Sequence, residues 1–183
     1  MSIVETEPYR RKLRRVNEPG QARFLTFSCY RRLPLLNNNS IRALFVERLK
    51  IVTEEHHVCL LAWVIMPEHT HLLLFPEDDT DIGRFTHALK RPFAEAVLRR
   101  WKQLNAPVLQ QIKHGDGYRY WQTGGGYDRN LITTQAVLEK ATYIHENPVR
   151  RNLAAVSTDY VWSSARWHAN LPDAKLPCGP MPY

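Results

Sequence analysis

Apolar and polar residues alternate along several short stretches of this chain and recur at three- and four-residue spacings along others. Alternation is typical of a strand with one buried face, and the longer spacing is typical of a helix packed on a core. On this basis the sequence predicts four strands and three helices. The strands are expected at 22–30, 58–66, 69–75 and 118–122, and the helices at 41–55, 82–104 and 135–146.

Polar residues and prolines at the ends of these segments indicate where the helices begin and end. Ser40 and Asp81 are expected to cap the first two helices, because short polar side chains accept hydrogen bonds from free backbone amides. Pro92 should kink or divide the second helix, since proline lacks a backbone N–H. Pro148 should end the third helix, because helical geometry is disfavoured in the residue before a proline.

The predicted elements follow one another as strand, helix, strand, strand, helix, strand, and then a further helix. This βαββαβ order predicts an α+β protein of the ferredoxin-like type, with an antiparallel sheet and helices on one face. The last helix, which carries Tyr143, is then a C-terminal addition. We expect a basic arm at residues 1–20, one folded domain at 21–168 and a C-terminal tail at 169–183.

Composition adds information about the partner and the compartment. The 183 residues include 25 Lys or Arg and 18 Asp or Glu, for a formal net charge of +7, which favours an anionic partner such as nucleic acid. No apolar run reaches the ~20 residues of a membrane helix, and the first residues do not resemble a secretory signal. The three cysteines form no CxxC pair, which is typical of free thiols in a reducing cytoplasm. We therefore expect a cytoplasmic protein that does not associate with membranes.

Two groups of cations are candidates for contacts with phosphates. One lies in the N-terminal arm and the other along the second predicted helix, and a solvated surface is the alternative interpretation of both. The residues are Arg10, Arg11, Lys12, Arg14 and Arg15 in the arm, and Lys90, Arg91, Arg99 and Arg100 in the helix.

Four further residues are candidates for chemistry. His69 and His71 are two residues apart on a predicted strand, so they would face the same way and could share a metal ion. An inert hydrogen-bonded pair is the alternative, because most histidines are not ligands. Tyr143 and Asn147 lie one turn apart on one helix face. A deprotonated tyrosine is a nucleophile, and divalent cations accept an amide oxygen as a neutral ligand, so His69, His71 and Asn147 could hold one ion beside Tyr143.

Five strings of the sequence resemble the REP-associated tyrosine transposases, which are HUH (His, hydrophobic, His) single-strand DNA transposases. In chain order they are MPEHTHLL at 66–73, WQ at 121–122, GYD at 126–128, YIHENPVR at 143–150 and WSS at 162–164. The resemblance covers roughly residues 22–167, and the first and fourth strings together are the most specific part of it.

The resemblance implies a metal-dependent enzyme that cleaves and rejoins single-stranded DNA at palindromic hairpins through a covalent 5′-phosphotyrosine. Matched by position, Tyr143 would be the nucleophile, and His69, His71 and Asn147 would bind Mg²⁺ or Mn²⁺. The implied partner is single-stranded DNA with a hairpin, and the cations of the arm would hold a short guide sequence beside it. The implied location is the cytoplasm, in association with the nucleoid.

Two residues depart from the usual family pattern. Thr70 stands at a position that is usually hydrophobic, and Glu68 stands where Asn is frequent. A hairpin-binding protein with little or no catalytic activity is the alternative function. A zinc hydrolase is a more distant one, since no third strong ligand follows in the HExxH pattern. The sequence leaves open a monomer or a homodimer, and action of Tyr143 on its own protomer or a partner.

Overall fold

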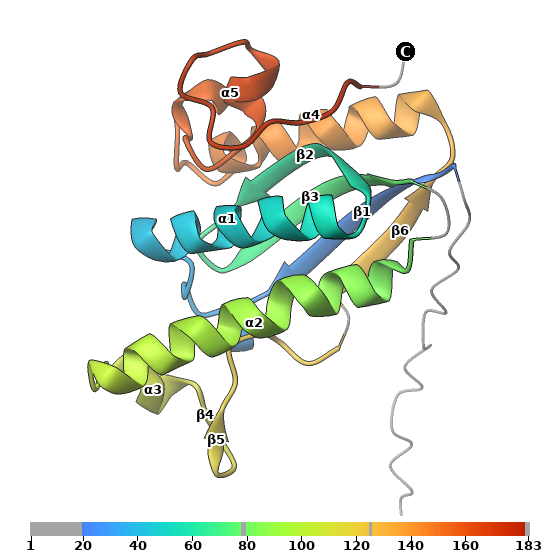
Figure 1. The fold of residues 1–183 in the computed structure, drawn as a ribbon. Helices are drawn as coiled ribbons and strands as arrows, with labels where there is room; N and C mark the ends of the chain where they lie inside the picture. Colours follow the sequence, from blue (N-terminus) through green and yellow to red (C-terminus); the bar gives the residue numbers. More distant parts are fainter. Residues whose placement is uncertain (1–19, 78–79, 125, 182–183) are drawn as a thin grey trace, which may run out of the picture.

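The computed structural model describes residues 20–77, 80–124 and 126–181 (Figure 1). The main sheet is built from four strands, and three long helices pack on it. The elements are β1 (Ala22–Ser28), η1 (Tyr30–Arg32), α1 (Asn39–Glu55), β2 (Val58–Ile65), β3 (His69–Pro76), α2 (Ile82–Gln103), α3 (Val108–Gln111), β4 (Lys113–His114), β5 (Gly117–Tyr118), β6 (Tyr127–Leu131), α4 (Thr134–Arg150), η2 (Ser157–Asp159) and α5 (Ala165–His168).

The main sheet is antiparallel, with the strand order β2-β3-β1-β6. Helix α1 connects β1 to β2, and α2 lies between β3 and β6 along the chain. The fourth strand therefore pairs with the first, as expected for a ferredoxin-like βαββαβ chain. The predicted α+β fold class is confirmed.

Helices α1 and α2 cover one face of the sheet, and α4 lies against the other (Figure 1). On β1, the Phe27 ring packs 6.2 Å from the Phe45 ring of α1, whereas the Phe24 ring packs 6.1 Å from the Tyr143 ring of α4. Positions 24 and 27 are an odd number of residues apart, so their side chains point to opposite faces. The helix with Tyr143 is thus the predicted addition, on the face that α1 and α2 leave open.

The fourth strand lies later in the chain than the sequence pattern predicted. Residues 118–122 were expected to form it, but Trp121 makes an isolated bridge to Cys29 and β6 begins at Tyr127. The aromatic pattern at 118–122 reflects burial of Tyr120 and Trp121 in the core rather than pairing in the sheet. Strand β6 has an exposed face and lies at the sheet edge, so its sequence YDRNL shows little apolar alternation.

The predicted caps are right for one helix and wrong for another. Asp81 accepts hydrogen bonds from Gly83 N and Arg84 N at the start of α2, as predicted. Helix α1 is capped by Asn38 and not by Ser40, because Asn38 Oδ1 accepts from the backbone amide of Ser40 at 2.9 Å. The cap is therefore two residues earlier than expected.

Neither interior proline ends a helix. Helix α2 runs unbroken through Pro92, and the Ala88 carbonyl, which loses its helical partner to the proline, accepts a hydrogen bond from Arg48 Nε of α1 at 3.1 Å. Helix α4 continues past Pro148 to Arg150, so the predicted end at residue 146 is wrong. Pro148 is buried, and packing holds the last turn in helical geometry.

The C-terminal residues cover the outer edge of β2. Ser163 bridges to Val64, and Gly179 N donates to Leu60 O at 2.8 Å. Leu176 is buried with the core. An uncovered edge strand is a template for pairing with another chain, so this segment protects the sheet.

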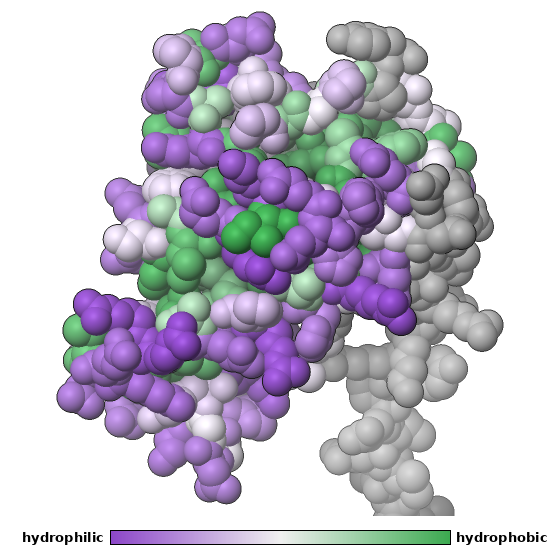
Figure 2. Space-filling model, in the orientation of Figure 1, coloured by the Kyte–Doolittle hydropathy of each residue, from purple (hydrophilic) through white to green (hydrophobic). Residues whose placement is uncertain are grey.

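The outer surface of α1 and α2 is mostly hydrophilic (Figure 2). A small hydrophobic area lies over α1, where Leu44 and Ile51 are 40% and 41% exposed. Among the described residues, no helix combines the length and the apolar character needed to cross a bilayer.

Candidate active site

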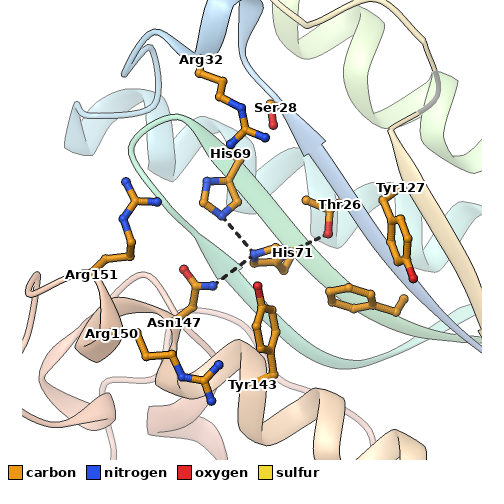
Figure 3. A pocket seen from close by; sticks show the side chains of 11 residues that line it. Thr26, Ser28, Arg32, His69, His71, Tyr127, Tyr143, Asn147, Arg150 and Arg151 are labelled. Carbon is orange, nitrogen blue, oxygen red and sulfur yellow. Dashed lines mark hydrogen bonds between the residues drawn. The ribbon is translucent and has the colours of Figure 1, made fainter. Parts of the chain in front are cut away.

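His69 and His71 lie at the start of β3, on the face that α4 covers (Figure 3). His69 pairs with Ser28 and His71 with Thr26 across the β1–β3 ladder, so both side chains point to the same face of the sheet. Their Nε2 atoms are 3.0 Å apart, and both residues are buried. The strand pairing therefore brings two imidazole nitrogens to one point.

Hydrogen bonds on the other side of each ring aim the Nε2 atoms at this point. His69 Nδ1 donates to Glu68 Oε1 at 3.2 Å, which leaves His69 Nε2 as a lone pair, since a carboxylate only accepts. His71 Nδ1 hydrogen-bonds Thr26 Oγ1 at 2.7 Å. The 3.0 Å contact between the Nε2 atoms is a hydrogen bond when His71 Nε2 carries the proton and His71 Nδ1 accepts from Thr26 Oγ1. When Thr26 Oγ1 accepts from His71 Nδ1 instead, both Nε2 atoms present lone pairs to the site. Burial lowers the pKa of both imidazoles, to about 3 for His71, and favours the neutral, ligating form.

Asn147 supplies a third polar group from α4. Its Nδ2 lies 3.3 Å from His71 Nε2, and its Oδ1 is buried with no hydrogen-bond partner among the described residues. A buried acceptor without a donor is costly, and a cation would satisfy it. The described residues contain no cluster of three His, Cys, Asp or Glu side chains suited to a metal. Two imidazole nitrogens and one amide oxygen are nevertheless a chemically reasonable donor set for a divalent ion.

Tyr143 lies one turn before Asn147 on α4, and the two residues face the histidines together. Its ring centroid is 5.4 Å from that of His71, at an interplanar angle of 72°. Figure 3 shows the hydroxyl end of Tyr143 pointing toward His71. Two cations flank the ring, with Lys140 Nζ 5.0 Å and Arg150 Cζ 5.1 Å from its centroid. The phenol oxygen is thus presented to the histidine pair in a positively charged environment.

A cavity of about 490 Å³ is lined by the two histidines and by Tyr143 and Asn147. Arg32, Arg150 and Arg151 add guanidinium groups to its wall, and Arg151 Nη1 pairs with Glu68 Oε1 at 2.9 Å. Glu68 therefore joins His69 to Arg151, and its charge is paired rather than directed at an incoming anion. The cavity is suited to a phosphate group, because guanidinium groups bind phosphate oxygens strongly.

Sequence reasoning missed the three arginines of the cavity. Arg150 is seven residues after Tyr143, which is two helical turns, so its place on the same face follows once α4 is known to continue past Pro148. The expected helix end concealed this signal. No periodic pattern indicates Arg32, which reaches the cavity because η1 follows β1 beside β3.

The cations predicted to bind DNA lie elsewhere or outside the described residues. Helix α2 is on the opposite face of the sheet from the cavity; there Lys90 Nζ lies 5.1 Å from the Phe27 ring centroid, and Arg91 pairs with Glu95 at 2.8 Å. Arg99 and Arg100 are exposed. The residues Arg10, Arg11, Lys12, Arg14 and Arg15 lie outside the described part of the chain. The roles of both groups stay predictions.

The fold and the cavity together define a class: an α+β protein whose four-stranded antiparallel sheet presents two histidines to a tyrosine on an added helix. The sequence model of the family described as "Transposase IS200 like" matches residues 21–146. The chain belongs to this family, and is thus a transposase-type, DNA-processing protein.

A solved structure supports the fold. A REP-associated tyrosine transposase, solved bound to a REP hairpin, is similar at a TM-score of 0.68 with 21% identity, over 93% of this chain and 92% of that chain. A candidate transposase from Deinococcus radiodurans is similar at a TM-score of 0.47 with 20% identity, over 73% of this chain and 95% of that chain. No curated protein sequence matches the chain.

Proposed function

We propose that this protein cleaves and rejoins single-stranded DNA beside hairpins, with Tyr143 as the nucleophile. The observation that carries the proposal is the position of Tyr143, with its hydroxyl end toward His71 and with Asn147 one turn further along the same helix. Membership of the transposase family supports it. The similar REP-associated transposase was solved with a REP hairpin, which supports hairpin DNA as the substrate class.

The cavity would hold the scissile phosphate. Arg150 is the last residue of α4 and Arg151 is the residue after it, and both line the cavity together with Arg32 of η1. Their guanidinium groups would bind the non-bridging oxygens and orient the phosphorus toward Tyr143. Positive charge around the cavity would also offset the negative charge that builds up in the transition state.

Cleavage would be a transesterification at phosphorus. The Tyr143 oxygen loses its proton to solvent and forms a bond to phosphorus, while the bond from phosphorus to the DNA 3′-oxygen breaks. The 3′-oxygen takes up a proton, and the 5′-phosphate stays on Tyr143 as an ester. Attack by a second DNA 3′-hydroxyl reverses the exchange and releases the phenol, so one phosphoester replaces another and no ATP is required.

His69, His71 and Asn147 would hold Mg²⁺ or Mn²⁺. The aligned Nε2 atoms and the unsatisfied Asn147 Oδ1 support this assignment. When bound, such an ion would supply Lewis-acid polarisation of the phosphate. Glu68 and Thr26 would position the imidazoles through Nδ1, as groups behind the ligands of metal sites commonly do.

Ion binding can be measured without DNA. Mn²⁺ should raise the thermal unfolding midpoint of the wild-type protein, because a ligand of the folded state stabilises it. The shift should be smaller in Asn147→Leu, which keeps the side-chain size and removes the oxygen. An equal shift in both proteins would argue against Asn147 as a ligand.

A covalent adduct tests the proposed chemistry directly. The protein is incubated with labelled hairpin DNA carrying single-stranded flanks, taken from sequence beside its own gene, with Mn²⁺ or with EDTA. A denaturing gel should show a protein–DNA adduct with Mn²⁺ that is absent with EDTA and absent in Tyr143→Phe. Tyr118→Phe, a half-buried tyrosine on β5, is the matched control and should retain the adduct. Hairpin binding without any adduct across the panel would favour the alternative of a DNA-binding protein without catalysis.

A further inference from the structure

A second cavity of about 170 Å³ opens beside the first. The two share Thr26, Ser28, Arg32 and Tyr127 in their walls, so they are adjoining parts of one surface. The far end of the second cavity includes Gln122, which has a polar side chain. A ligand in the main cavity can therefore extend into the second without crossing the core.

Tyr127 stands between the two cavities. It is the first residue of edge strand β6 and is 45% exposed, although its ring packs edge-on against Phe24 with centroids 5.9 Å apart. Figure 3 places it across the cavity from Arg151. The preceding Gly126 holds this position close to β1, because a Cβ there would lie 2.2 Å from Thr26 O. An aromatic ring is thus fixed in place and still accessible at the cavity wall.

Arg32 reaches both cavities from a strained backbone. Arg31 and Arg32 have φ angles of 53° and 55°, a conformation that non-glycine residues rarely adopt. The Arg31 amide donates to Gln122 Oε1 at 3.0 Å, so the loop that forms the far end of the second cavity also holds this turn. Strain of this kind persists only where surrounding contacts enforce it, and it is concentrated at functional sites.

We propose that the second cavity binds an unpaired nucleobase next to the scissile phosphate. The base stacks on Tyr127, and Arg32, which lines both cavities, contacts the scissile phosphate. Gln122, whose Oε1 accepts from the Arg31 amide, offers its Nε2 N–H to the base edge. This subsite rests on the proposed function and adds a base-binding position to it: the protein holds the unpaired nucleotide beside the cleavage position by its base. Aromatic stacking of this kind is tolerant of base identity, and hydrogen bonds at the edge add preference.

The test measures binding in a Tyr143→Phe background, where no covalent link forms. Hairpins with and without a single-stranded flank are titrated, and the fluorescent base 2-aminopurine is placed at each flank position in turn. The variants are Tyr127→Ala, Tyr127→Leu and Tyr127→Trp. Ile132→Ala, which removes an 80% exposed apolar side chain just beyond β6 and outside both cavities, is the matched control.

Stacking should quench 2-aminopurine at one flank position in the parent protein. Tyr127→Ala and Tyr127→Leu should abolish that quenching and weaken binding of the flanked hairpin by about 5- to 150-fold. Tyr127→Trp and Ile132→Ala should keep both signals, and the hairpin without a flank should bind all variants alike. Folding of each variant is checked by its thermal unfolding midpoint.

The subsite is overturned if no flank position is quenched, if Tyr127→Leu retains the quenching, or if flanked and unflanked hairpins lose affinity equally. The adduct assay in the protein with Tyr143 intact is scored separately. A quenched position without an adduct would keep the subsite and refute the transposase chemistry. An adduct without a quenched position would do the reverse.

Discussion

Replacing Gly126 by alanine should destabilise the protein more than replacing Gly124. Both glycines have positive φ angles, 79° and 93°. A Cβ at 126 would lie 2.2 Å from Thr26 O and 3.1 Å from Phe27 Cβ, whereas a Cβ at 124 meets nothing within 4 Å. The two substitutions share the conformational penalty, and only Gly126→Ala adds a collision with the backbone of β1.

The magnitudes follow from these two contributions. A left-handed conformation costs a non-glycine residue about 1–2 kcal/mol. Alanine also lowers the conformational entropy of the unfolded chain, which stabilises the folded state by about 0.4–1 kcal/mol and offsets part of that cost. Gly124→Ala should therefore lower the free energy of unfolding by roughly 1 kcal/mol. Overpacking costs a further 1–3 kcal/mol or so, which gives Gly126→Ala a loss of roughly 2–4 kcal/mol.

Urea denaturation of the two variants and the wild type measures these losses. The adduct assay at a temperature where all three are folded adds a functional readout. Gly126→Ala should also reduce the adduct yield, because a shift of Thr26 disturbs the residue that hydrogen-bonds His71 Nδ1. Equal losses of stability in the two variants would refute the steric argument.

Two further substitutions and one thiol-labelling reaction test buried contacts of the sheet and its helices. Asp128→Asn should lower the free energy of unfolding by about 3–5 kcal/mol in urea, because Arg23 loses the carboxylate of a buried bidentate pair (2.7 and 3.0 Å); a loss below 1 kcal/mol would contradict this. Arg48→Met keeps the apolar stem and removes the donor to Ala88 O, so the same assay should show a loss of about 1–3 kcal/mol, and an unchanged urea midpoint would show that the carbonyl needs no donor. Burial raises the pKa of the Cys29 thiol to about 12, so the reactive thiolate is scarce at pH 8. Iodoacetamide should modify Cys29 only in denaturant, as followed by peptide mass spectrometry. Rapid modification of Cys29 in the folded protein would show that its thiol is not buried.

The end of α4 illustrates how a local rule can hide a functional residue. Pro148 predicts a helix end, and by that rule Arg150 would leave the face of Tyr143. The helix continues because Pro148 is buried and Arg151 N closes the last turn on Asn147 O at 3.1 Å. Tertiary packing thus outweighs the local preference.

The sequence by itself determined the order of the four strands of the main sheet and the three long helices, and it placed His69 and His71 on one face of a strand. These are properties of near neighbours, set by the geometry of a strand or a helix turn, and a periodic pattern records them. The tertiary structure was needed for the contacts that join distant segments: Arg151 with Glu68, Arg32 beside the histidines, and the exposed ring of Tyr127 at the cavity wall. It was also needed to locate β6, whose edge position requires few apolar residues. Such contacts form only when the sheet and α4 pack against each other, so they cannot be predicted from the spacing of residues along the chain.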